Sequence, residues 1–261
     1  MAIKGIDISN WNGSIDFSKV KADGISFVMV RGGWSTEIDP RADEYLTQCN
    51  KFGIPAGIYW FSYALSVDDA KKEAAACLAL AKKYRIEYPI AYDFEDDSIA
   101  YFGRMGKTCN KQLATAIVNT FLSEITKAGY YAVNYSNANF LTNWFNAINF
   151  PLWLAAWYIQ KPDRACQMWQ HSSTGKVDGI NGNVDMNYSY VDFPSYLKSK
   201  GYNNLSTPPW IEQASEWAID GVDWAVKNGI LEGVGGNDYA LQKPVTREQL
   251  CTMLKRYNDL R

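Results

Sequence analysis

Short runs of β-branched and aromatic residues alternate with longer segments of helical periodicity as far as residue 190. This alternation is typical of βαβ units that build a largely parallel sheet. We expect strands at 4–8, 26–31, 56–61, 89–94, 131–135, 152–156, 166–170 and 184–188. Eight strands are enough for an α/β fold of the (β/α)8-barrel type, and a length below the ~250 residues typical of that fold predicts short or missing helices. A doubly wound open sheet is the alternative.

Polar capping signals mark the ends of two helices between these strands. Ser66-Val67-Asp68-Asp69 resembles a capping box, and it predicts a helix that continues to about Lys83. Asn110 is placed to begin another helix, which Gly129 ends. Helical periodicity predicts two further helices over 40–52 and 138–147.

The composition changes after Tyr196, where polar residues lead into a double proline at Pro208 and Pro209. We therefore expect a barrel domain over 1–195, a linker over 196–209 and a small all-α domain over 210–261. The last domain is expected to hold two amphipathic helices, near 210–228 and 246–258. About 50 residues rarely form an independent core, so this segment is expected to pack on the barrel or on copies of itself.

Charge and cysteine usage narrow the choice of partners and compartment. The formal net charge is −2 and basic residues form no dense run, which argues against a nucleic-acid partner. No uninterrupted apolar run reaches the ~18 residues of a membrane span. The five cysteines are odd in number and widely spaced, as expected of free thiols in a reducing compartment. The first residues enter strand-like alternation at once, so we expect no secretory signal and synthesis in the host cytoplasm.

A single histidine, His171, excludes most hydrolytic chemistries. Zinc hydrolases usually need two or three histidine ligands, and no HExxH or CxxC motif replaces them. A nucleophilic serine or cysteine would have to rely on His171, and no G-x-S-x-G elbow is present. We therefore expect neither a metal ion nor a cofactor, and carboxylate chemistry remains.

The strongest acidic motif follows the predicted strand at 89–94. Because side chains alternate along a strand, Asp93 and Glu95 share one face, with Cα atoms roughly 6.5–7 Å apart. Asp7 and Asp185 stand at similar strand ends, where the catalytic residues of barrels gather. Crowded carboxyls have raised pKa values, so one of the four can act as an acid while the others stay ionised. The alternative for any single acid is a helix cap or a surface ion pair.

Aromatic side chains are unusually frequent, at 15% of the chain. Their flat apolar faces suit the binding of sugars, and the alternative is that they fill the core. Composition by itself does not separate these two uses.

Residues 1 to about 193 resemble the family 25 glycoside hydrolases, the muramidases common among phage endolysins. The resemblance is carried by Lys4-Gly5-Ile6-Asp7-Ile8-Ser9, Gly57-Ile58-Tyr59-Trp60-Phe61, Asp93-Phe94-Glu95, Met168-Trp169-Gln170 and Gly182-Asn183-Val184-Asp185-Met186-Asn187. Two positions depart from it, because Trp60 stands where the family often has histidine and His171 where tyrosine is common. These departures bear on substrate preference.

The resemblance implies a role for each acid. Glu95 is implied to be the proton donor, and Asp93 to stabilise the charge at the anomeric carbon, while Asp7 and Asp185 hold and tune that pair. It also implies retention of configuration, with the nucleophile left open between an enzyme carboxylate and the substrate's acetamido group. Candidates for contact with the glycan are Tyr59, Phe61, Tyr135, Trp157 and Gln170.

Residues 210–261 resemble one S-layer homology repeat, a module that binds cell-wall polysaccharides. Such repeats usually occur as three in tandem, so a single copy implies a homo-oligomer built through this tail, with a trimer as the simplest form. The resemblance implies that Arg247 helps to bind a secondary wall polymer. The alternative is a surface arginine beside Glu248 at a helix start.

The sequence thus predicts an endolysin-type lysozyme that cleaves the β-1,4 bond between N-acetylmuramic acid and N-acetylglucosamine in peptidoglycan. It is expected to reach the wall after holin-type release. Two alternatives remain: a non-catalytic wall-binding protein on the same barrel, and a chitinase-like hydrolase.

Overall fold

The chain forms two compact units, Met1–Leu205 and Ser206–Arg261. A computed structural model describes residues 2–205, 213–235 and 238–260. The predicted linker over 196–209 is wrong as far as residue 205, because helix α6 (Phe193–Lys200) and the residues after it belong to the first unit. The buried Asn203 side chain fixes this segment: it accepts the Tyr131 N–H at 2.7 Å and donates to the carbonyl of Tyr88 at 3.0 Å.

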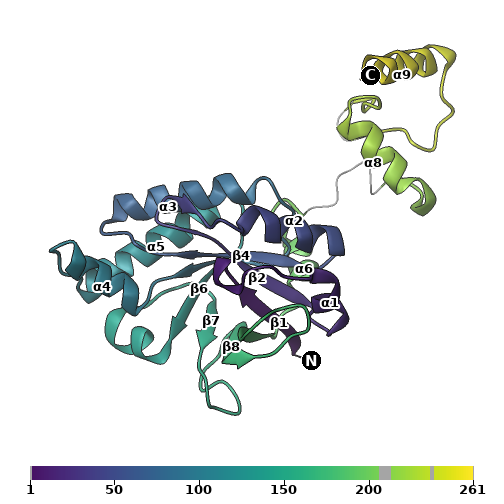
Figure 1. Cartoon of the computed structure of the whole chain (residues 1–261). Coiled ribbons are helices and arrows are strands. Elements are labelled where there is room, and N and C mark those ends of the chain that lie inside the picture. The colour runs from purple at the N-terminus through teal and green to yellow at the C-terminus, as the bar shows by residue number, and fades with distance from the viewer. Residues whose placement is uncertain (1, 206–212, 236–237, 261) are drawn as a thin grey trace. The chain divides into compact units, whose positions relative to one another are not determined.

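The first unit is a closed barrel of eight strands (Figure 1). The strands are β1 (Ile3–Ile8), β2 (Phe27–Trp34), β4 (Ala56–Phe61), β5 (Ile90–Asp93), β6 (Ala132–Asn137), β7 (Leu152–Ala155), β8 (Met168–Gly175) and β9 (Val184–Ser189). The pairing of β1 with β2 closes the sheet, so the predicted barrel is confirmed and the open doubly wound sheet is excluded. A short β3 (Glu37–Ile38) folds back on the end of β2 and pairs antiparallel with it.

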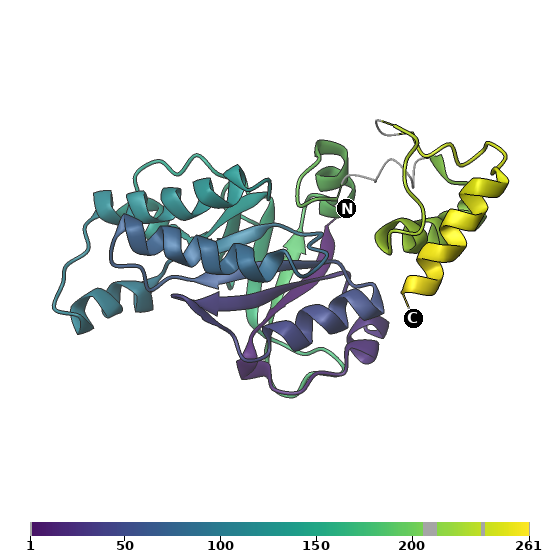
Figure 2. The same cartoon turned by 90° about the horizontal axis from the view of Figure 1, so that it is seen from above.

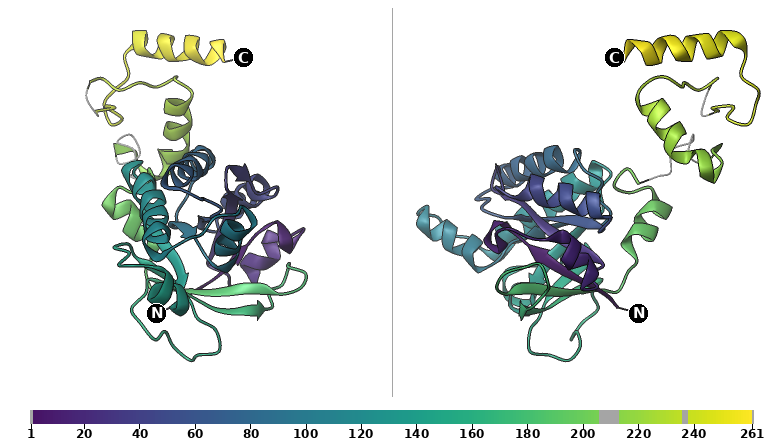
Figure 3. Two further views of the ribbon diagram at one scale, coloured as in Figure 1. Left: turned by 90° about the vertical axis from the view of Figure 1, so that its left-hand side faces the viewer. Right: turned by 45° about the vertical axis from the view of Figure 1, so that its right-hand side comes forward.

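The barrel lacks some of its helices, as the short length of the domain predicted. Apart from the short β3, neighbouring strands from β1 through β8 pair in parallel, whereas β9 runs antiparallel to both β8 and β1. In the described part of the chain, no helix separates β7 from β8 or β8 from β9. Figure 3 shows β8 and β9 as a long antiparallel pair. The fold is therefore of the (β/α)8 type with its last units replaced by a hairpin.

Helices cover the remaining strands, and Figure 2 shows α3 and α5 side by side on the outer face of the barrel. Their bounds are α1 (Phe17–Ala22), α2 (Ala42–Phe52), α3 (Val67–Ala81), α4 (Asp96–Arg104) and α5 (Lys111–Lys127). The predicted helix over 138–147 is a π-helical turn, η2 (Phe140–Trp144). The helices α1, α4 and α6, which are short, were not predicted from the sequence.

The predicted caps explain where the two longest barrel helices begin. The Ser66 Oγ accepts the Asp69 N–H at 3.2 Å at the start of α3, and the Asn110 Oδ1 accepts the Leu113 N–H at 2.8 Å at the start of α5. Each bond satisfies a backbone donor that the first turn of a helix leaves free. Gly129 follows α5 at φ +85°, a backbone conformation that glycine adopts readily.

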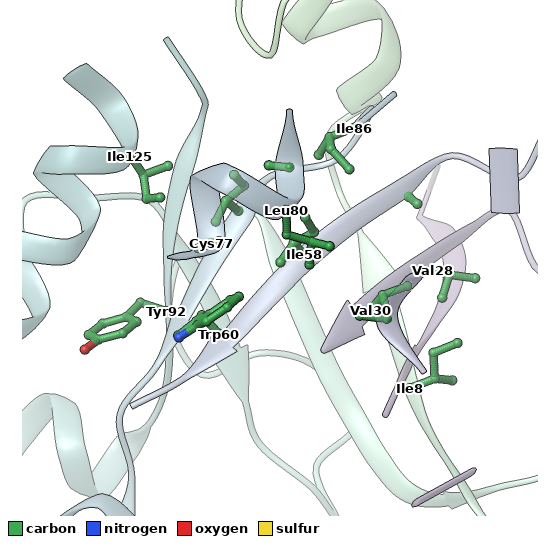
Figure 4. Packing of buried hydrophobic residues seen from close by; sticks show 14 of the residues in the cluster. Ile8, Val28, Val30, Ile58, Trp60, Cys77, Leu80, Ile86, Tyr92 and Ile125 are labelled. Atoms are coloured by element: carbon green, nitrogen blue, oxygen red, sulfur yellow. The ribbon is translucent and has the colours of Figure 1, made fainter. Parts of the chain in front are cut away.

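Two apolar clusters stabilise the barrel. The larger one lies between the outer strand faces and the helices, where Figure 4 shows side chains such as Ile58, Trp60 and Leu80. The smaller one fills the barrel interior with Phe27, Trp153 and other large side chains. The interior is narrow, since a Cβ on Gly5 would lie 2.3 Å from the Phe27 ring. Because side chains fill the barrel interior, a ligand is expected to bind at the end of the barrel where the parallel strands have their carboxyl ends.

The second unit holds η3 (Glu216–Ala218), α8 (Ile219–Lys227) and α9 (Arg247–Asp259). The predicted helix over 246–258 is confirmed by α9. The helix predicted near 210–228 is divided into η3 and α8, and its first residues, 210–212, lie outside the described residues. Among the described residues, no helix combines the length and apolar character needed to span a membrane.

Candidate active site

Strand register brings the predicted acids to one end of the barrel. On β1 and β9, Asp7 and Asp185 lie directly opposite each other. On the other side of the barrel, Asp93 of β5 is paired in register with Phe61 of β4 and Tyr135 of β6. One expectation is corrected: Asp185 lies near the start of β9 rather than at its carboxyl end. It reaches the same rim because β9 runs in the opposite direction to its neighbours.

These residues line one cleft of about 470 Å³. The cleft contains every barrel site residue that the sequence predicted, namely Asp7, Asp93, Glu95, Asp185, Tyr59, Phe61, Tyr135, Trp157 and Gln170. It also contains residues that sequence reasoning missed, among them Ser9, Trp11, Asn12, Arg31, Trp153, Ser173 and Asn183. The remaining predicted residue, Arg247, begins α9 of the second unit.

Asp7 is held by two side-chain amides. Gln170 Nε2 donates to its Oδ2 at 2.9 Å, and Asn187 Nδ2 donates to the same oxygen at 2.7 Å. Burial, reinforced by the charge of Asp185, raises the pKa of Asp7 far above its usual range, and the two amides oppose this effect. Burial also raises the pKa of Asp185. At neutral pH this pair therefore carries less negative charge than two free aspartates.

Asp93 is the most isolated of the acids. Only 6% of its surface is exposed, and its Oδ1 has no hydrogen-bond partner among the described residues. Burial is the main cause that raises its pKa, the charges of Glu95 and Asp7 add to it, and Arg31 opposes it. A buried oxygen without a protein partner is available to an atom of a ligand in the cleft.

Glu95 follows β5 and occupies the N-cap position of α4. Burial raises the pKa of Glu95 to about 6, and the nearby charges of Asp96 and Asp97 contribute. A carboxyl with this pKa is protonated in a substantial fraction of molecules in mildly acidic solution, while it still releases its proton readily. This is the property that a general acid needs.

Most aromatic residues of the cleft fall into two groups, and Phe61, which packs on Tyr63 with ring centroids 5.1 Å apart, belongs to neither. Tyr59 and Tyr135 pack edge-on against Trp153, with ring centroids 6.2 and 4.8 Å apart, and they form part of the barrel interior. Trp157 and Trp11 are exposed instead, by 42% and 83%. Exposed rings at the rim are the ones free to stack on a ligand. Trp11 was missed because it belongs to a short 3₁₀ turn after β1, which has no periodic signal.

The side-chain amide of Gln170 is hydrogen-bonded to other residues of the site. Its Oε1 accepts hydrogen bonds from the Tyr135 hydroxyl at 3.0 Å and from Trp157 Nε1 at 3.1 Å, while its Nε2 holds Asp7. One amide thereby links three predicted site residues. Its predicted contact with the glycan remains a prediction.

Arg31 is the only basic side chain among the described residues that line the cleft. Its Nε donates to Asp39 Oδ2 at 2.8 Å, and its guanidinium also bonds to Asn10. The alternation of β2 carried a signal for it, since Arg31 follows Phe27 and Met29 on the inward face. Its charge lowers the pKa of Asp93.

Neither departure from the family pattern lies in the cleft. Trp60 is fully buried against the outer core, and its Nε1 donates to the Ser35 carbonyl at 2.9 Å. His171 stacks on Tyr188 with ring centroids 4.5 Å apart. These two residues are therefore not placed to contact a substrate in the cleft directly, and their expected effect on substrate preference stays a prediction.

Hydrolysis of a glycosidic bond by two carboxylates needs an acid of raised pKa beside a second carboxyl, and this barrel places Glu95 and Asp93 in that relation at its open end, next to exposed aromatic side chains. The fold and the site thus define a glycoside hydrolase. The comparisons identify the family: the sequence model of Glycosyl hydrolases family 25 matches residues 6–180. The chain belongs to this family. A second model, the S-layer homology domain, matches residues 211–251.

Several relatives share the first unit. The uncharacterised protein YegX of Escherichia coli K12 is 32% identical over 203 residues, which is 71% of this chain and 68% of that protein. Lysozyme M1 of Streptomyces globisporus is 27% identical over 212 residues, 71% of this chain and 67% of that protein. The modular autolysin LytC of Streptococcus pneumoniae, solved with a synthetic peptidoglycan ligand, has a TM-score of 0.65 at 29% identity. That match covers 72% of this chain and 47% of the autolysin.

Proposed function

We propose that the chain hydrolyses the β-1,4 bond between N-acetylmuramic acid and N-acetylglucosamine in bacterial peptidoglycan, with Glu95 as the general acid. The observation that carries this proposal is the arrangement of Glu95, Asp93, Asp7 and Asp185 in one cleft, with the pKa of Glu95 raised to about 6. Membership of family 25 and the similarity to bacterial lysozymes support the choice of substrate.

In the proposed reaction, Glu95 donates its proton to the glycosidic oxygen as the bond to the anomeric carbon breaks. Asp93 lies beside it, and its Oδ1 has no partner among the described residues. Asp93 stabilises the positive charge that develops on that carbon in its ionised form, which Arg31 and that developing charge both favour against the effect of burial. Configuration is retained: either the substrate's acetamido group or a carboxylate forms the first new bond to the anomeric carbon. Water then displaces that group, and Glu95, ionised after the first step, takes up the proton of the water. Isolation of a covalent sugar adduct on the enzyme, or its absence with an oxazoline intermediate instead, decides between these two nucleophiles.

Replacement of Glu95 by Gln tests the assignment of the acid. Lysis of purified cell walls should fall by at least about 10²-fold, because general acid catalysis contributes 10²–10⁴-fold. Glu124→Gln on the surface of α5 is the matched control, since its carboxylate pairs with Lys127 on the same helix and does not line the cleft. Unchanged lysis by Glu95→Gln would remove the assignment.

Mass spectrometry of the products tests the substrate. A muramidase leaves N-acetylmuramic acid at each new reducing end. Cleavage of chitin without release of muropeptides would establish a chitinase-like hydrolase instead. Binding to walls with no cleavage of either polymer would establish a non-catalytic wall-binding protein.

We also propose that the second unit binds a secondary cell-wall polymer, with help from Arg247, and that it joins chains into a homo-oligomer. The match to an S-layer homology domain supports wall binding. Association is supported by apolar side chains that a unit of this size leaves exposed, such as Trp217 at 88% and Leu254 at 58%. Light scattering of the full chain tests the oligomer, and a trimer is expected. A monomer at all concentrations would exclude it.

The proposed biological role is host lysis, in which an endolysin is made in the cytoplasm and reaches the wall after holin-type release. The five cysteines are free thiols, which fits synthesis in a reducing compartment. Expression of the chain in a bacterium with and without a holin tests this role. Lysis that does not depend on the holin would argue against it.

A further inference from the structure

A group of buried polar side chains lies behind the cleft, on the outer face of β5. Ser62, Glu73, Tyr92 and Ser98 each expose 1% or less of their surface. They come from four different parts of the chain: the residue after β4, α3, β5 and α4. Figure 4 shows Tyr92 beside Trp60, among the apolar side chains between the strands and the helices. The group thus lies within the apolar core.

Short hydrogen bonds connect the first three members of this group. The Tyr92 hydroxyl lies 2.6 Å from Glu73 Oε2 and 2.8 Å from the Ser62 Oγ. Glu73 Oε1 accepts the N–H of Tyr63 at 3.0 Å. One buried carboxyl on α3 therefore binds both β5 and the segment that follows β4.

The backbone of Ser62 connects this group to the acids of the cleft. Its N–H donates to the Asp93 carbonyl at 2.9 Å, and its carbonyl accepts the Ser98 hydroxyl at 2.7 Å. The same Ser98 Oγ accepts the N–H of Glu95 at 3.2 Å. Hydrogen bonds thus run continuously from Glu73 to the backbone on both sides of Phe94, the residue between the two acids.

We propose that Glu73 is a positioning residue for hydrolysis: through Tyr92, Ser62 and Ser98 it fixes the backbone that carries Asp93 and Glu95. This inference rests on the proposed function of those two acids. Glu73 is too deeply buried to touch a substrate. Its effect is on geometry, and a displacement of about 1 Å at a reacting group can reduce a rate by about 10²-fold.

A purely stabilising role would not require a carboxyl at this position. Ala70, Ala74 and Cys77, which are also buried on α3, show that apolar side chains suit this interface. Burying a polar group costs free energy unless the group is hydrogen-bonded. A buried group that is fully hydrogen-bonded favours one arrangement of its partners over others. The arrangement specified here is the end of β5.

The protonation state of Glu73 determines which substitutions test the proposal. Burial raises the pKa of Glu73 to about 8, so the carboxyl is neutral at a pH where Glu95 acts as an acid. A glutamine has the same shape, accepts the Tyr63 N–H with its oxygen and donates to the Tyr92 hydroxyl with its nitrogen. A leucine has a similar volume and makes neither bond. Glu73→Gln is therefore the conservative variant, and Glu73→Leu is the disruptive one.

Cell-wall hydrolysis by the full chain tests the proposal in these variants and in Tyr92→Phe. For Glu73→Leu and Tyr92→Phe, kcat should fall between tenfold and a hundredfold, with KM changed less than twofold. Glu73→Gln should stay within twofold of the wild type in both constants. The control is Tyr88→Phe, which removes a buried hydroxyl that has no bond to this group. It should leave kcat unchanged.

A second measurement needs no substrate. Amide hydrogen exchange over 90–98 should be faster in Glu73→Leu and Tyr92→Phe, and unchanged in Glu73→Gln. If Glu73→Leu does not fold, Tyr92→Phe and Ser98→Ala decide the outcome. Wild-type kcat and wild-type exchange in these folded variants would overturn the proposal, as would an equal loss in Glu73→Gln and Glu73→Leu. A wild-type chain that hydrolyses no wall would refute the proposed function, and the exchange data would still decide this inference.

Discussion

Replacing Glu73 by Gln should change how the stability of the protein depends on pH. Burial raises the pKa of this carboxyl from 4.5 to about 8. A carboxyl whose pKa is higher in the folded chain binds its proton more tightly there than in the unfolded chain. Its contribution to stability is therefore complete below pH 4.5 and is lost as the pH rises through about 8. Glutamine does not titrate, so the variant lacks this loss.

The size of the effect follows from the two pKa values. Between pH 5 and pH 8, the free energy of unfolding of the wild type should fall by about 3–4 kcal/mol through Glu73 alone. The other buried carboxyls titrate in both proteins, so their contributions cancel when the variant is compared with the wild type. Glu73→Gln should therefore be more stable relative to the wild type at pH 8 than at pH 5, by about 3–4 kcal/mol.

Urea unfolding of the full chain at several pH values, followed by near-ultraviolet circular dichroism, measures this difference. Glu44→Gln is the control, because Glu44 pairs with Arg41 on the surface, where an ion pair contributes little. Its stability should follow the wild type at every pH. Parallel curves for Glu73→Gln and the wild type would show that the carboxyl is ionised in the folded protein, and the reasoning would be refuted.

Three further predictions concern activity and wall binding. The rate should fall about tenfold per pH unit as the pH rises above about 6, because Glu95 must hold its proton; a pH–rate profile checks this, and a rate that stays level up to pH 8 would contradict it. Trp157→Ala should raise KM about three- to tenfold, since a ring contact contributes about 0.5–1.5 kcal/mol, with a smaller change in kcat; steady-state kinetics on soluble glycan fragments measure both. Arg247→Ala should lower the fraction of protein that sediments with purified walls and leave hydrolysis of soluble fragments unchanged; equal sedimentation would exclude a role for Arg247.

Much of the barrel was predictable because its signals are local. Short runs of β-branched and aromatic residues placed all eight barrel strands, and the caps at Ser66 and Asn110 placed two helices. The short helix α6 was missed, because the polar composition of residues 196–205 outweighed a weak periodicity. That segment is held by the long-range hydrogen bonds of Asn203 to Ile86, Tyr88 and Tyr131, which have no counterpart in a local pattern.

The sequence by itself determined the chemical class of this protein. With a single histidine and acids at strand ends, it left carboxylate chemistry, and the spacing of Asp93 and Glu95 placed both on one face of a strand. The tertiary structure decided the rest. It reversed β9, so that Asp185 meets Asp7 across two antiparallel strands, and it brought the buried Glu73 of α3 behind the acids of β5. Such contacts join residues that are distant in the sequence, and the burial that raises the pKa of Glu95 exists only once the barrel has closed.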